Sequence, residues 1–141
     1  KAFKQTEHKV AGDFNTLIPE MIKKEKGERV RDIYLYSYWC AASRMWVSLV
    51  PLFEPDKQDT ARLWVATPLA KAHRVAGTYD QEIAAACQDL GERSLGDPLG
   101  SVDLADKFAN EVLKVQKKLL SKYMTEEQVD MVTQPFLKRK P

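Results

Sequence analysis

The feature that most constrains this fold is a run of about twenty mostly apolar and aromatic residues from Tyr34 to Phe53. Its length is close to what a helix needs to cross a bilayer. Arg44 lies in the middle of the run, however, and a charged side chain at the centre of a bilayer costs roughly 2.5 kcal/mol or more. We therefore expect residues 28–50 to form the central helix of a soluble bundle, ended by Pro51, and not a membrane span.

This central helix has few polar positions, so other helices are expected to surround it. One face carries Leu35, Tyr38, Ala42, Met45 and Leu49. A second, aromatic face carries Tyr36, Trp39, Trp46 and Phe53. The third face is small and partly polar, with Ser37, Cys40, Ala41, Arg44 and Ser48.

Apolar residues spaced by three and four positions predict further helices on both sides of the central one. A first helix is predicted over about residues 10–26, bent or restarted at Pro19. A third is predicted over residues 56–75, with a kink at Pro68. Thr78 and Gln81 have the spacing of a capping box and predict the start of a fourth helix.

The C-terminal part of the chain shows one loop and two more helix starts. Three glycines and Pro98 make residues 91–100 the clearest predicted loop. Ser101 is then expected to cap a long helix that reaches Met124. A second capping-box spacing, from Thr125 to Gln128, predicts a short last helix that ends at Pro135. The sequence thus predicts one all-α domain over residues 1–141, with five to six helices and more than about 60% helix, well above the usual one-third.

Two cysteines, Cys40 and Cys87, fall on two different predicted helices, each beside small residues. Small side chains let helices approach closely, which would bring the sulfur atoms near disulfide geometry. The alternative is two separate buried thiols, because free cysteine is among the most buried residue types. A disulfide would indicate a periplasmic or secreted setting, and it is the only basis for that localisation. No charged stub followed by a long apolar stretch begins the sequence, so no signal peptide is predicted.

Motifs for metal binding and catalysis are not convincing. The two histidines, His8 and His73, belong to no metal-binding motif. Asp103 and Asp106 share a helix face, but acidic residues in a first helical turn commonly complement the helix dipole. The segment at residues 91–96 approaches a nucleophile elbow but has Glu92 where the first glycine belongs, and no strand precedes it. We therefore expect no metal, no cofactor and no catalytic residue.

Basic residues form two clusters and a tail, yet acidic residues are interleaved with them and the net charge is only +2. This mixture is typical of a solvated surface and does not favour nucleic-acid binding. The clusters are Lys23, Lys24, Lys26, Arg29 and Arg31; Lys114, Lys117, Lys118 and Lys122; and the tail at residues 137–141.

Arg44 is the most informative single residue, because a charge inside an apolar helix must pair, reach solvent or meet an anionic ligand. Pairing with Asp80 or Glu82, or extension to the surface, is the simpler interpretation. The alternative is a ligand-binding or enzymatic pocket walled by Tyr38 and Trp46 around Arg44. The sequence favours a small non-enzymatic helical protein that binds another protein, such as an inhibitor, an immunity-type partner or a secretion accessory. It leaves self-association open.

Overall fold

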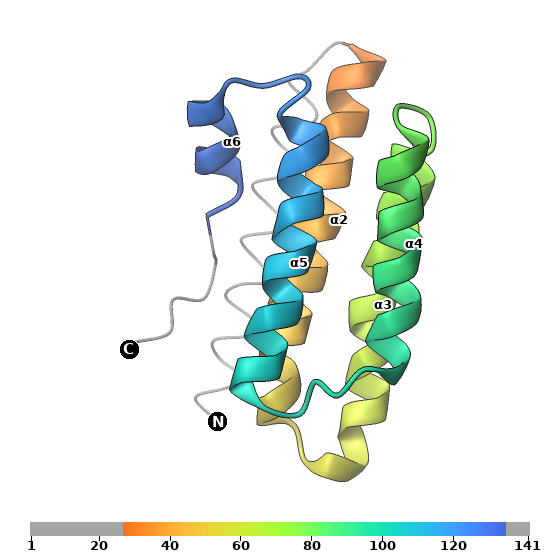
Figure 1. The fold of residues 1–141 in the computed structure, drawn as a ribbon, viewed down its shortest axis with the longest axis vertical. Coiled ribbons are helices and arrows are strands. Elements are labelled where there is room, and N and C mark those ends of the chain that lie inside the picture. The colour runs from red at the N-terminus through yellow and green to blue at the C-terminus, as the bar shows by residue number, and fades with distance from the viewer. Residues whose placement is uncertain (1–26, 135–141) are drawn as a thin grey trace.

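The computed structural model describes residues 27–134, and helices account for 82% of them. Within this range the chain forms five α-helices and no strand, which confirms the predicted all-α bundle (Figure 1). The helices are α2 (Glu28–Leu49), α3 (Gln58–Ala76), α4 (Gln81–Gly96), α5 (Val102–Leu120) and α6 (Glu126–Val132), with 3-10 turns η1 (Val50–Leu52) and η2 (Pro55–Lys57). The predicted helix over residues 10–26, the stop at Pro135 and the basic tail lie outside the described residues.

The long helices α2 to α5 lie side by side, and the short α6 sits beside one end of α5 (Figure 1). α2 packs against both α3 and α5, and α3 packs against α4. α4 and α5 make a smaller contact, while α2 and α4 face each other diagonally across the bundle. This order follows the chain, since each short connection joins neighbouring antiparallel helices.

The predicted central helix, α2, is buried on more than one side. Ile33, Tyr36 and Val47 belong to the main core that α2 shares with α3, α4 and α5. A second buried cluster lies on another side of α2 and contains Ala41, Met45 and Leu49. Burial on several sides explains why so few positions of this helix are polar.

The beginning of α4 differs from the prediction. Its N-cap is Asp80, whose carboxylate accepts a hydrogen bond from the Ile83 amide at 3.0 Å, and not Thr78. Gln81 does not close a capping box, since its side chain donates to the Gly77 carbonyl at 2.7 Å. Aspartate caps a helix as well as threonine does, so spacing alone could not choose between the two positions.

The segment predicted as a loop at residues 91–100 is helical up to Gly96. No described glycine has a positive φ, so glycine is not used here for a turn. A Cβ on Gly91 would lie 3.6 Å from the Leu69 Cβ, which places the α4 backbone close to α3 at this point. Packing against α3 therefore continues the helix through residues that on their own favour a turn.

The two remaining caps are where the sequence predicts them. The Ser101 hydroxyl accepts from the Leu104 amide at 3.2 Å, and Thr125 and Gln128 cap each other's backbone amides. α5 ends at Leu120, earlier than expected, so Met124 lies in the turn before α6. α3 continues through Pro68, which lies inside it.

Candidate functional site

Arg44 reaches from α2 toward α5 and the end of α6. Its Nη1 donates to the Gln116 side-chain oxygen at 2.9 Å and to the Thr133 carbonyl at 3.0 Å. Gln116 is fully buried and donates in turn to the carbonyl and the hydroxyl of Ser37, both at 3.1 Å. We call Arg44, Gln116, Ser37 and Thr133 the Arg44 network. It joins three helices through polar groups whose partners lie far apart in sequence.

The Arg44 network does not contain the acidic partner that the sequence suggested. No carboxylate within residues 27–134 lies in ion-pair distance of Arg44. Asp80 pairs instead with Lys122, and this contact lowers the pKa of Asp80. Burial lowers the pKa of Arg44, because the guanidinium is partly removed from water. Arg44 therefore pairs with neither Asp80 nor Glu82, since both lie at the start of α4, diagonally across the bundle from α2.

Tyr38 and Trp46 do not point toward the Arg44 network. Trp46 packs against Trp64 of α3, with ring centroids 4.7 Å apart, while Arg44 contacts α5. Tyr38 packs edge-on against Trp39 at 4.8 Å and borders the second buried cluster. At about 100° per residue, Trp46 is turned from Arg44 by about 200° and Tyr38 by about 240°. Closeness in sequence therefore does not bring these three side chains together.

Cys40 and Cys87 are buried free thiols, so the predicted disulfide is absent. Their small neighbours suggested direct packing of α2 on α4, but these helices are diagonal and α3 and α5 lie between them. Both thiols belong to the main core, and burial raises the pKa of Cys40. Without the disulfide, the expectation of a periplasmic or secreted setting loses its support.

Tyr36 of α2 contacts both α4 and α5 beside the two cysteines. Its side chain is fully buried, and its hydroxyl donates to the Val115 carbonyl of α5 at 2.8 Å. The same hydroxyl lies 3.5 Å from the sulfur of Cys87. Burial raises the pKa of Tyr36 well above the ordinary value of a phenol. The hydroxyl thus stays protonated and acts as a structural hydrogen-bond donor.

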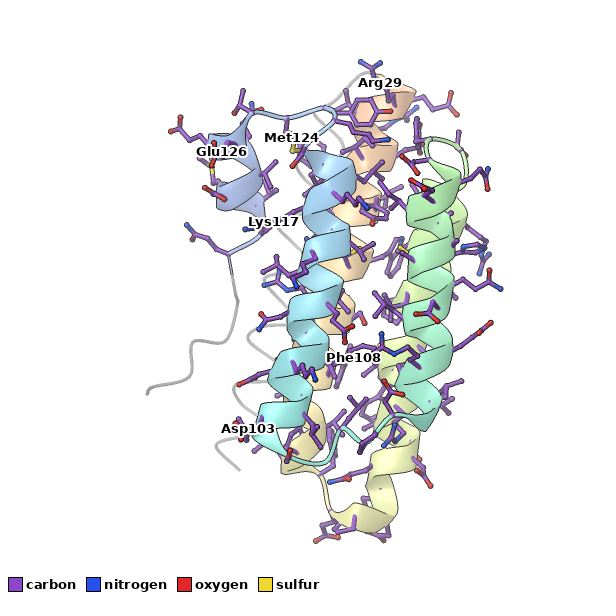
Figure 2. All side chains as sticks on the ribbon, in the orientation of Figure 1. Arg29, Asp103, Phe108, Lys117, Met124 and Glu126 are labelled. Atoms are coloured by element: carbon purple, nitrogen blue, oxygen red, sulfur yellow. The ribbon has the colours of Figure 1, made fainter. Side chains whose placement is uncertain are left out.

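A small hollow of about 120 Å³ lies between the end of α4 and the start of α5. Arg93 lines it. Its guanidinium forms a bidentate ion pair with Glu111, at 2.8 and 3.0 Å, and a second ion pair with Asp97, at 3.0 Å. Its guanidinium lies over the ring of Phe108, which projects from α5 toward α4 (Figure 2). The hydrogen bond with Arg93 lowers the pKa of Glu111. Because these charges satisfy one another and the hollow is smaller than usual ligand pockets, we interpret it as a clamp between two helices.

The outward side of α3 presents large apolar side chains to solvent, a feature that the sequence analysis missed. Leu63 is 54% exposed and Trp64 is 40% exposed. We define the α3 face as the exposed residues Thr60, Leu63, Trp64, Thr67, Ala70 and Arg74. The available signal was that Ala61, Val65, Leu69, Ala72 and Ala76 already form a complete buried stripe, which leaves Trp64 outside it.

Trp64 is held in place although it is exposed. Its ring contacts Trp46 of α2 and also lies edge-on to Phe53, with centroids 5.7 Å apart. Such aromatic pairs contribute roughly 0.5–1.5 kcal/mol beyond the area they bury. The indole therefore presents one ordered, apolar surface to solvent while its other side packs on two rings.

His73, Lys117 and Arg29 each contact a neighbouring group in the bundle. His73 lies with its Nδ1 atom 2.7 Å from the Ala84 carbonyl, and residues 27–134 contain no group of three potential ligands that could hold a metal ion. His8 lies outside the described residues. Lys117 forms an ion pair with Asp130 between α5 and α6 (Figure 2). Arg29 lies over the ring of Tyr123. Among the described helices, none is long and apolar enough to cross a membrane.

No family model, curated protein or solved structure matches this chain. No residue role is therefore carried over from another protein. The contacts, exposure and charges of this chain's own residues are therefore the basis for its proposed function.

Proposed function

We propose that this chain is a non-enzymatic helical protein-binding domain, of the kind that serves as an inhibitor, an immunity-type partner or a secretion accessory. Its contact surface is the α3 face. The observation that carries the proposal is the exposure of Leu63 and Trp64 side by side on one helix, with Trp64 fixed by Trp46 and Phe53.

Trp64 and the lack of charge around it are what the α3 face shares with the centre of an interface. Tryptophan is enriched among the residues that dominate binding energy, and charged residues are depleted there. Between its two ends the α3 face carries Thr60, Leu63, Trp64, Thr67 and Ala70, with no charge. Because Trp64 is already ordered in the free chain, it loses little conformational freedom when a partner covers it.

Polar groups inside the bundle support a binding function over a catalytic one. Arg44 is engaged with Gln116 and Thr133, and Arg93 is engaged with Glu111 and Asp97. The Tyr36 hydroxyl is engaged with the Val115 carbonyl. Each of these groups joins two or more helices, which is a sufficient reason for its presence.

A second candidate function is binding of a small anion at Arg44, in a pocket bordered by Tyr38 and Trp46. It is favoured by one observation: the hydrogen-bond partners of Arg44 among the described residues are neutral. The divergence of Tyr38 and Trp46 from Arg44 disfavours it, and we rank it below the α3 face.

Leu63→Glu tests the proposed surface, with Met131→Glu as the matched control. Met131 is 65% exposed on α6, on the other side of the bundle from α3 (Figure 1). A charge at the centre of an apolar interface should reduce capture of the partner protein by the tagged full chain at least about tenfold, whereas Met131→Glu should leave capture unchanged. Both variants should keep the wild-type circular dichroism spectrum. Undiminished capture by Leu63→Glu would place the contact elsewhere.

A further inference from the structure

Opposite charges mark the two ends of the α3 face. Asp59 lies at the N-terminal end of α3, and its carboxylate is 99% exposed although Oδ1 lies 3.8 Å from Nε of Arg62. Arg74 is exposed in the last turn, and Lys71 lies one turn before it, with its ammonium group 4.3 Å from the centre of the Trp39 ring. Arg62 does not belong to the face, because its guanidinium donates to the carbonyls of Ser94 and Asp97. The face is therefore acidic at one end, apolar in the middle and basic at the other.

Two copies of this face have complementary charges when their α3 helices run antiparallel. Asp59 and Arg74 lie about 22 Å apart along the axis, at 1.5 Å per residue. The midpoint between them falls between Ala66 and Thr67, and Leu63 and Ala70 lie at equal distances on either side of that midpoint. A second α3 laid antiparallel across the first would thus place each acidic end opposite a basic end. A parallel arrangement would place like charges opposite each other.

We propose that the protein on the α3 face is a second copy of this chain, in a two-fold dimer with the two α3 helices antiparallel. The inference rests on the proposed function of the α3 face and names its partner. In such an isologous interface every contact occurs twice. Asp59 of each copy therefore meets Arg74 of the other copy, and Thr67 lies near the two-fold axis.

Charge reversal at the two ends of the face tests the arrangement. In an Asp59→Lys homodimer both end contacts join two cations, and in an Arg74→Asp homodimer both bring two carboxylates together. Each variant alone should dimerise about tenfold more weakly than wild type at low ionic strength. In an equimolar mixture, however, Asp59→Lys pairs with Arg74→Asp through two attractive contacts. The mixture should recover wild-type affinity, measured by sedimentation equilibrium of the full chains.

The mixture is also the control for folding, because misfolded variants could not restore each other. Leu63→Glu should abolish the dimer, and Met131→Glu should leave it intact. A wild-type chain that stays monomeric up to millimolar concentration would overturn the dimer. The antiparallel arrangement would be overturned if neither charge reversal weakened the dimer. It would also be overturned if the mixture dimerised no more tightly than each variant alone. If the chain is monomeric while Leu63→Glu still abolishes capture of a different protein, the proposed function stands and only its assigned partner fails.

Discussion

Replacing Leu69 by alanine should lower the free energy of unfolding by about 2–5 kcal/mol. Leu69 is fully buried on α3, which packs against both α2 and α4. The close backbone of α4 at Gly91 cannot readily collapse into the space that the leucine vacates, so a cavity remains. A loss of this size is a large share of the roughly 5–15 kcal/mol that stabilises a typical domain. Urea denaturation at monomeric concentration measures it.

Leu63→Ala is the matched control, since both leucines lie on α3 and only their burial differs. Because more than half of the Leu63 side chain is exposed, its truncation should change the free energy of unfolding by no more than about 0.5 kcal/mol. Equal losses at the two positions would contradict the orientation of α3 on which the α3 face depends.

Arg44→Met should destabilise the fold by about 1–3 kcal/mol. Methionine keeps most of the apolar stem but removes the donor to the Gln116 oxygen, which is fully buried and would be left without it. The Thr133 carbonyl loses the same donor. Thermal and urea unfolding of the variant measure the loss.

The double variant Arg44→Met with Gln116→Leu separates the network from other contributions of Arg44. Removing both hydrogen-bonding partners should cost less than the sum of Arg44→Met and Gln116→Leu measured separately, because the double variant no longer contains the Gln116 oxygen that Arg44→Met alone leaves without a donor. Additive losses would show that the two side chains do not depend on each other. If Arg44 instead anchors an anion, Arg44→Met would abolish anion binding and leave the stability of the ligand-free chain unchanged.

Features that depend on local chemistry are the ones that the sequence predicts well. The extent of α2 follows from its apolar run and Pro51, and the caps at Ser101 and Thr125 use neighbouring residues. The helical state of residues 91–96 depends instead on the approach of α3 to Gly91. No local pattern contains that contact, so the glycines alone predict a loop.

The candidate site also depends on contacts between residues far apart in sequence. Arg44 finds its partners 72 and 89 positions away, and neither is acidic. Cys40 and Cys87 both lie in the main core, but on diagonal helices, which the small residues around them could not reveal. The exposure of Trp64 arises because small residues such as Ala61 and Ala72 already fill the contact surface of α3. Hydrophobicity alone assigns such a tryptophan to the core.

Site-specific photocrosslinking tests the central claim, that the α3 face is where this protein binds its partner. A photoreactive phenylalanine analogue is placed at position 63 in one full-length variant and at position 131 in another, and both are irradiated in the cell that produces the protein. The two sites are comparably exposed, so they differ in their location and not in their access to solvent. We predict a defined adduct from position 63 and none from position 131, and an adduct with the mass of two chains identifies the second copy. Adducts from position 131 with none from position 63 would contradict the claim.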